Sequence, residues 1–320
     1  RNLIAAEIGI VLPKVRVRDD ATLGEQEYEI RLFGDVVARR ELRIEKLLAV
    51  NDGRTTGSVA GETVIDTITG TAATWINADH REQALIYGYT TRTPTTAMTD
   101  HLEEIARSYA DELLSRDATK HLLDELHKES PAMVDELVPS VMKVAEVQKA
   151  LQGLLRESIP IRQLGVILEG LSDAAQRTED PEARIEMVRA RLARTLCAGL
   201  RDSNRVLHVV TLDRDVIADV DRVQDENARG GHAHSGDGTV GAIGKPSEIT
   251  CDAIRRAVKK LTSIGHPPVI LVAPPLRRRV KQVADLDGLT VHVLSTSEIT
   301  SDTETQFHAT ASLSRSPAAA

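Results

Sequence analysis

The residue types that most suggest chemistry gather in one polar loop, rich in glycine and histidine, between Gln224 and Gly244. Within this loop, Gly236–Gly241 (GDGTVG) matches the GxGxxG pattern of dinucleotide-binding proteins. That pattern binds a pyrophosphate where a strand turns tightly into a helix, because the ligand then meets the helix N-terminus. No strand pattern precedes the match, so we interpret it as a chance occurrence.

Two further features of the same loop could bind a ligand. Gly244-Lys245 is similar to the end of a phosphate-binding loop, but Thr239 occupies its first glycine position and Pro246 replaces the hydroxyl residue that would hold magnesium. Three side chains of the loop are suitable metal donors: His232, His234 and Asp237. A flexible loop without another fixed ligand makes a poor metal site, so we predict neither a metal nor a cofactor.

Elsewhere in the chain, no pattern points to catalysis, and we expect a protein that is not an enzyme. No GxSxG segment is present to place a nucleophilic serine. Cys197 and Cys251 lie on apolar helical faces, which predicts buried small hydrophobic residues, and two cysteines are too few for a disulfide framework. The basic run Arg277–Arg279 opens a predicted helix, and we interpret it as an exposed face.

The composition excludes several function classes. The 320 residues include 40 Lys and Arg against 48 Asp and Glu, and a net charge of −8 disfavours a broad nucleic-acid surface. Aromatic residues make up 2%, too few for the stacking platforms of single-strand binders. The best apolar run, Pro267–Leu276, is shorter than the roughly 18 residues that a membrane-spanning helix needs. Because the chain starts at Arg1, we expect it to be processed or to be one piece of a longer protein.

The first hundred residues have the pattern of a mixed α/β region, and the length predicts two or more domains. Short strand patterns occur at Ile8–Leu12 and Tyr28–Phe33, separated by turns. Residues 79–87 read as a brief helix that ends at Gly88.

The remainder divides into a helical stretch and a second α/β region. Apolar residues recur at helical spacing over roughly residues 100–200, and Asp100 with Glu103 has the spacing of a helix N-cap and its reciprocal carboxylate. Beyond residue 205, three strand patterns (206–212, 269–273 and 289–294) alternate with two helical ones (246–261 and 275–284). This alternation predicts a small, mainly parallel sheet, followed by a disordered tail over 312–320.

Ordered sequence blocks carry a resemblance to a known family. Residues 148–157 read QKALQGLLRE, and IRQL and ILE follow at 161–164 and 167–169, where the family has QKVLQNLLRE, IRDL and ILE. Other blocks fall in the family's order: Val17-Arg18-Asp19, Trp75-Ile76, Gly88-Tyr89-Thr90, His101-Leu102, Glu136–Pro139 and Asp180-Pro181. Over roughly residues 1–200, the chain resembles the cytoplasmic domain of the FlhA family of flagellar export-gate proteins.

The resemblance implies an α+β fold of four subdomains. The first is a discontinuous α/β subdomain, residues 1–44 and 94–114, into which a ferredoxin-like subdomain is inserted at 45–93. A helical third subdomain covers 115–195 and a small α/β fourth subdomain covers 196–311. In the family, a membrane-embedded helix bundle and a linker precede this region, so the linker would end just before Arg1.

The resemblance also implies a docking platform on the cytoplasmic face of the bacterial inner membrane, arranged as a nonameric ring. Its implied partners are flagellar export chaperones with their late substrates, the export ATPase complex and the substrate-specificity switch protein. We expect no nucleic acid among them. The corresponding subunit of a virulence injectisome is one alternative. From a different class, a nucleotide-binding α/β enzyme that uses the glycine-rich loop is another.

In the family, chaperones dock in a depression between the first two subdomains, lined by an Asp, a Phe and a Thr. Asp66 matches the Asp, but Thr69 stands in place of the Phe, in a block that reads DTITG where the family has DPAFG. Asp100 stands in place of the Thr. A buried aromatic anchor often contributes about 2 kcal/mol or more to binding. We expect either that the partner surface differs or that Ile68 supplies the anchor, while Asp100 either caps its helix or contacts the partner.

Overall fold

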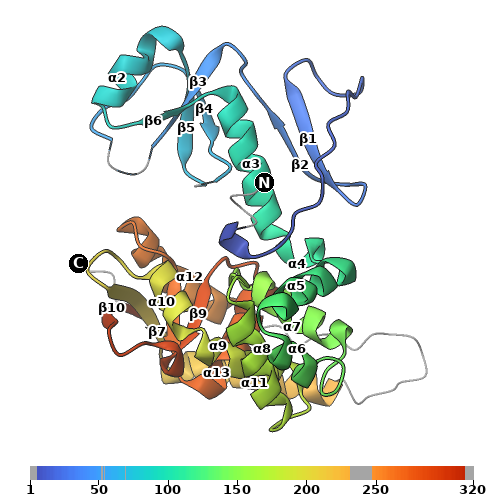
Figure 1. Cartoon of the computed structure of the whole chain (residues 1–320). Coiled ribbons are helices and arrows are strands. Elements are labelled where there is room, and N and C mark those ends of the chain that lie inside the picture. The colour runs from blue at the N-terminus through green and yellow to red at the C-terminus, as the bar shows by residue number, and fades with distance from the viewer. Residues whose placement is uncertain (1–5, 52, 54, 69, 231–246, 314–320) are drawn as a thin grey trace. The chain divides into compact units, whose positions relative to one another are not determined.

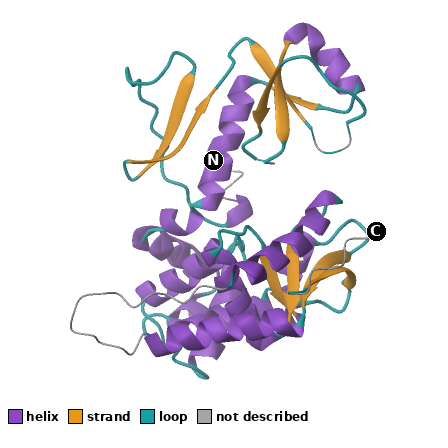
Figure 2. Cartoon of the chain, turned by 180° about the vertical axis from the view of Figure 1, so that it is seen from behind, coloured by secondary structure: helices purple, strands orange, loops and turns teal. Residues whose placement is uncertain are grey.

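The structure, a computed structural model, describes residues 6–51, 53, 55–68, 70–230 and 247–313. The chain divides into two units, Arg1–Ile185 and Glu186–Ala320, and each is described by itself (Figure 1 and Figure 2). Both units contain helices and strands, so the fold is α+β. Within the described ranges, no helix is long and apolar enough to cross a membrane. The ligand-like motifs at 232–245 lie outside the described residues, as does the tail from residue 314.

The first unit contains two β-structures. β1 (Glu27–Leu32) and β2 (Asp35–Glu41) form an antiparallel pair. A separate antiparallel sheet has the order β4-β5-β3-β6, with β3 (Lys46–Val50), β4 (Glu62–Ile65), β5 (Ala72–Asn77) and β6 (Thr90–Arg92). η1 (Ala78–His80) and α2 (Arg81–Ile86) connect β5 to β6, and Gly88 follows with φ 86°. The predicted strand at Tyr28–Phe33 and helix at 79–87 are therefore confirmed. The ferredoxin-like assignment and the four-subdomain division stay predictions.

The strand predicted at Ile8–Leu12 is wrong, although its alternating burial is real. Residues 6–8 are helical and residues 9–20 belong to no strand, yet Ile8, Ile10 and Leu12 are all buried. The segment packs against a loop: Ile161 N–H donates to the Ile8 carbonyl at 2.7 Å. Gly9 has φ 90°, and a Cβ there would lie 2.4 Å from the Arg162 backbone nitrogen. Period-2 burial thus arises from close packing against this loop without any strand partner.

Helices dominate the rest of the first unit: α3 (Pro94–Ser108), α4 (Ala110–Leu113), α5 (Arg116–Glu129), α6 (Pro131–Leu137), α7 (Val144–Arg156) and α8 (Leu164–Ala175). α9 (Pro181–Arg191) continues into the second unit. The predicted N-cap at Asp100 is wrong, because α3 begins six residues earlier. Thr93 accepts a hydrogen bond from Thr96 N–H and Pro94 takes the first helical position, a stronger start signal.

The second unit is built on a parallel sheet in the order β10-β7-β8-β9. Its elements are α10 (Ala193–Leu200), β7 (Val206–Leu212), α11 (Arg214–Gly230), α12 (Glu248–Ser263), β8 (Val269–Val272), α13 (Pro274–Leu286), β9 (His292–Ser295), η2 (Thr296–Glu298) and β10 (Glu304–Ala311). The predicted parallel sheet is confirmed, and β7 has the predicted bounds. β10 was not predicted, because it is an edge strand in which only Ala311 is buried, so no apolar alternation marks it.

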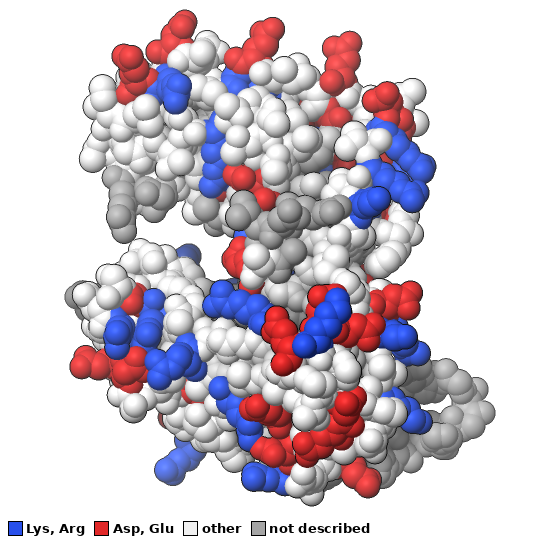
Figure 3. All heavy atoms as spheres, in the orientation of Figure 1, with Lys and Arg blue, Asp and Glu red and all other residues white. Residues whose placement is uncertain are grey.

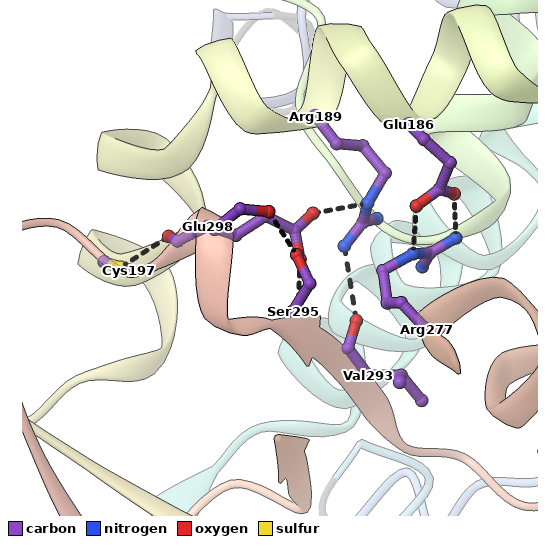
Figure 4. A network of polar contacts seen from close by, with 8 residues as sticks. Glu186, Arg189, Cys197, Arg277, Val293, Ser295 and Glu298 are labelled. Atoms are coloured by element: carbon purple, nitrogen blue, oxygen red, sulfur yellow. Dashed lines mark hydrogen bonds and ion pairs between the residues drawn. The ribbon is translucent and has the colours of Figure 1, made fainter. Parts of the chain in front are cut away.

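Buried charges fasten α9 to the sheet of the second unit (Figure 4). Arg189 and Glu298 are each 2% exposed, and Arg189 Nε donates to Glu298 Oε1 at 2.7 Å. Glu298 also accepts from Ser295 N–H at 2.6 Å, and its carbonyl accepts from the Cys197 thiol at 3.2 Å. Beside this pair, the buried Arg277 donates to both carboxylate oxygens of Glu186. The expected exposed basic face at Arg277–Arg279 is therefore wrong for Arg277.

Removing the cation of the buried pair should destabilise the second unit strongly. In Arg189→Met, the Glu298 carboxylate keeps its buried position but loses its counter-charge, which should cost about 3–5 kcal/mol of unfolding free energy. Arg194→Met is the control, because Arg194 is 80% exposed and lies 3.9 Å from Asp302. Urea unfolding of both variants makes the comparison; equal midpoints for the two would contradict the assigned role of the pair.

A methyl group at Gly9 should be far more costly than at a glycine with similar backbone angles but open surroundings. Gly53 has φ 87°, and nothing would lie within 4 Å of a Cβ there. Both Ala variants bear the left-handed backbone cost of roughly 1–2 kcal/mol. Only Gly9→Ala adds a clash with the 161–162 backbone, about 1–3 kcal/mol more. Thermal unfolding that finds equal losses for both would refute this packing.

Candidate interaction site

The first unit has a cavity of about 330 Å³, which we call the Trp75 pocket. Apolar side chains line one part of it: Leu42, Leu48, Val64, Ile65, Trp75 and Ala97. Charged side chains line another part: Arg40, Glu41, Arg43, Glu62 and Asp66, with Tyr28 and Thr67 beside them. An apolar pocket bordered by charges is the usual form of an anchor site for a partner side chain.

The register of the four-stranded sheet explains why these residue types meet. Leu48 on β3 pairs with Trp75 on β5 and with Arg92 on β6, and Trp75 pairs in turn with Glu62 on β4. Residues paired directly across a sheet point to the same face, so this row presents an acid, an aromatic ring, an aliphatic group and a base side by side. Arg43 holds Glu62 through two hydrogen bonds of 2.8 and 2.6 Å, which lowers the pKa of that carboxyl.

Arg92 lies between the two predicted site carboxylates. Its Nη1 is 3.3 Å from Asp66 Oδ1 and its Nε is 3.5 Å from Asp100 Oδ2. Asp66 is 2% exposed, whereas the side chain of Asp100 is 30% exposed and that of Arg92 is 19% exposed. The charge that Asp100 adds is thus paired within the chain. Asp66 cannot reach a partner without movement, so Arg92 and Asp100 are the accessible parts of this trio.

Of the other two predicted site residues, Ile68 and Thr69, the structure describes only Ile68. Ile68 is 36% exposed, and the pocket residue Ile65 is 67% exposed. Thr69 lies outside the described residues. Sequence reasoning missed Arg92, whose position three residues after Tyr89 gives no motif. The only available signal was the strand pattern that places it opposite Leu48.

A hydrogen bond between the half-buried Tyr28 and the buried His101 links β1 to α3 beside the pocket. Tyr28 on β1 and His101 on α3 share a hydrogen bond of 2.6 Å between the hydroxyl and Nδ1. Burial raises the pKa of Tyr28 to about 12, and burial lowers the pKa of His101, with Arg40 acting in the same direction. Both groups are therefore neutral at physiological pH, and the contact is a neutral hydrogen bond.

In the part of the chain that the structure describes, no group of three or more His, Cys, Asp or Glu side chains could hold a metal ion. Cys197 and Cys251 are buried as predicted, and burial raises the pKa of the Cys251 thiol to about 11. On the face drawn in Figure 3, basic and acidic side chains are interspersed, so this face presents no field of a single sign.

Comparison with known proteins places the chain in a family. It matches the FHIPEP family over residues 1–304, and it belongs to that family. The flagellar biosynthesis protein FlhA of Caulobacter vibrioides is 35% identical over 303 residues, which cover 93% of this chain and 42% of that protein. FlhA of Bacillus subtilis is 30% identical over 306 residues, 96% of this chain and 44% of the relative. The chain thus spans less than half the length of these relatives.

Several solved structures share the fold of this chain. The Chlamydia pneumoniae CdsV protein, in a structure of its complex with CdsO, has a TM-score of 0.79 and 21% identity, covering 96% of this chain and 86% of that one. Nonameric EPEC SctV-C has a TM-score of 0.73 and 22% identity, covering 97% and 91%. At these identities, the likeness establishes the fold alone.

Removing one hydroxyl should reveal how much the Tyr28–His101 contact contributes. Tyr28→Phe deprives the buried His101 Nδ1 of its partner, which should cost about 1–3 kcal/mol of unfolding free energy. Tyr87→Phe is the matched control, since its hydroxyl has only a 3.4 Å hydrogen bond from the exposed Gln83. Chemical denaturation of both variants tests this, and a loss for Tyr87→Phe as large as that for Tyr28→Phe would contradict it.

Proposed function

We propose that this chain is an interaction domain of a flagellar protein export gate that receives export chaperones with their substrates. Membership of the FHIPEP family and similarity to flagellar FlhA proteins along more than nine-tenths of the chain support the gate assignment. The Trp75 pocket is the observation that supports docking. It combines an apolar lining with charged side chains in the region to which the family resemblance assigns chaperone binding.

The pocket's chemistry suggests how docking would proceed without an aromatic residue at position 69. A partner side chain would enter the apolar lining around Leu48 and Trp75, and exposed Ile65 and Ile68 would pack around it. Asp66 would act indirectly, by holding Arg92 in place through their 3.3 Å contact. Next to the pocket, the partner would meet Arg92, which contacts the lining residue Asp66, and Asp100.

The wider proposal follows the family. In the full-length protein, this region would lie on the cytoplasmic face of the bacterial inner membrane, would act by binding and not by catalysis, and would divide into the four predicted subdomains. The export ATPase complex and the specificity switch protein would be further partners, and nine copies would form a ring, as in the nonameric SctV-C structure. The flagellar assignment is favoured over an injectisome because the flagellar relatives reach 30–35% identity.

Substitution of the exposed isoleucines tests the site without disturbing the core. We expect Ile65→Asp and Ile68→Asp to weaken calorimetric binding of the cognate flagellar chaperone–substrate complexes by about tenfold or more, or about 1.4 kcal/mol. A carboxylate there would remain unpaired against the apolar surface of the partner. Ile86→Asp is the control, because Ile86 is 79% exposed but lies on α2, which contributes no residue to the pocket lining, whereas Ile68 directly follows the lining residues 65–67.

The possible outcomes separate the site from the role. Full binding by the pocket variants would move the docking site elsewhere while keeping the export-gate role. Equal weakening in the Ile86→Asp control would show that the effect is not local to the pocket. No binding of any chaperone complex by the unsubstituted chain would refute the receptor proposal.

A further inference from the structure

Three histidines from different parts of the second unit lie together beside the strand pair β7 and β10 of the parallel sheet. His208 lies on β7, His308 on the edge strand β10, and His266 in the turn between α12 and β8. The His208 and His266 rings are stacked, with centroids 3.5 Å apart and planes within 13°. The centroid of His308 lies 5.0 Å from that of His208 and 5.9 Å from that of His266. Three groups that can each become cationic are therefore in mutual contact.

Hydrogen bonding assigns the hydrogens of the neutral cluster. His208 Nε2 lies 3.3 Å from Asp202 Oδ2, and since a carboxylate only accepts, this nitrogen carries the hydrogen. The backbone N–H of Val206 is the main cause that lowers the pKa of Asp202, so its carboxyl is ionised at neutral pH. His208 Nδ1 is then an acceptor, and His308 Nε2, 2.8 Å away, donates to it.

This arrangement tolerates one added proton but not several. His308 can gain a hydrogen at Nδ1 and still donate to His208. If His208 were also protonated, two N–H groups would face each other at 2.8 Å and their hydrogen bond would be lost. A charged His266 would stack directly on that ring.

The carboxylate of Asp202 can compensate for one added proton in the cluster but not for several. The groups that act on His266 are His208 from β7, His308 from β10 and Asp202 from the segment before β7. Burial is the main cause that lowers the pKa of His266, and the two neighbouring histidines act in the same direction. The nearby Asp302 is already shared by Arg194, Arg201 and Arg205, all directed at its Oδ2.

The strand that carries His308 has a neighbouring strand on one side only, although Ala309 and Ala311 pack into the core of the second unit. β10 is an edge strand that pairs only with β7, and its register shifts between Phe307 and Ala309, with His308 at the irregularity. Phe307 is 61% exposed. Side-chain hydrogen bonds also link the two strands: the His208–His308 bond and a 3.1 Å contact between the Thr211 and Thr310 hydroxyls.

We propose that the histidine triad is a pH-sensitive attachment of the edge strand: protonation below about pH 6.5, the ordinary titration range of histidine, breaks the His208–His308 bond and releases β10 from β7. The sign follows from linkage. A histidine that is harder to protonate while β10 is paired with β7 takes up its proton when the two strands separate. Separation of the strands therefore becomes easier as pH falls. Each extra proton taken up raises the opening constant by up to about tenfold per pH unit.

Amide hydrogen exchange of the whole chain at pH 7.5 and 5.5 tests the proposal, with opening constants corrected for intrinsic exchange rates. We expect β10 amides to open about tenfold more at pH 5.5 than at 7.5, while β8 and β9 of the same sheet keep their protection. His308→Gln can donate its amide N–H to neutral His208 and can turn its amide oxygen to accept from protonated His208, so its β10 should lose most of this pH dependence. His266→Gln, in a turn, gives a second independent variant.

His127→Gln is the control, since His127 is a titratable residue of the first unit that lies 3.1 Å from Asp135. It should keep the full pH dependence of β10. The proposal is overturned if β10 protection is equal at the two pH values, or if β8 and β9 lose protection together with β10. It is equally overturned if both Gln variants behave like the unsubstituted chain, or if the control removes the effect.

Discussion

The second unit depends on one constraint: two guanidinium groups of the sheet-and-helix interface are buried and must be neutralised. Arg189 and Glu298 are almost wholly removed from water, so each would be costly without the other. The carboxylate of Glu298 neutralises Arg189. It also accepts a hydrogen bond from Ser295 N–H, and the Glu298 carbonyl accepts one from the Cys197 thiol, which links η2 to α10. Glu186 likewise neutralises Arg277. These ion pairs attach α9, the helix that carries Glu186 and Arg189, to η2 and α13 of the second unit.

The candidate site in the first unit follows the same rule with a different result. The carboxylates in its lining are paired, Glu41 and Glu62 with Arg43 and Asp66 with Arg92, and apolar side chains around Trp75 line the rest of the cavity. Arg92 pairs with Asp66 and Asp100 together, so the acidic residue at position 100 is matched by a basic residue from the adjacent strand. A pocket whose charges are already paired is suited to anchor an apolar side chain, because docking there leaves no charge unpaired. This is the physical basis for proposing a binding role for the domain.

Sequence patterns succeeded where burial is continuous and failed where packing is irregular. The bounds of β7 could be predicted because five of its seven residues are buried, whereas β10 has only one buried residue and shows no apolar pattern. The strand predicted at Ile8–Leu12 is wrong: its alternating apolar residues are buried because Gly9 allows the chain to lie against a loop. The spacing of Asp100 and Glu103 resembles a capping box, but Thr93 is the N-cap of α3 and Pro94 is its first residue.

The sequence by itself determined the family, the α+β class, the parallel sheet and the burial of both cysteines, since these depend on ordered blocks and on periodic burial along one chain segment. Only the tertiary structure decided which charges meet. Nothing local pairs Arg189 with Glu298, 109 positions apart, or Arg92 with Asp66. The same holds for the three histidines, which come from two strands and a turn. Such contacts are set by strand register and helix packing, and a one-dimensional pattern carries no information about them until the fold brings the segments together.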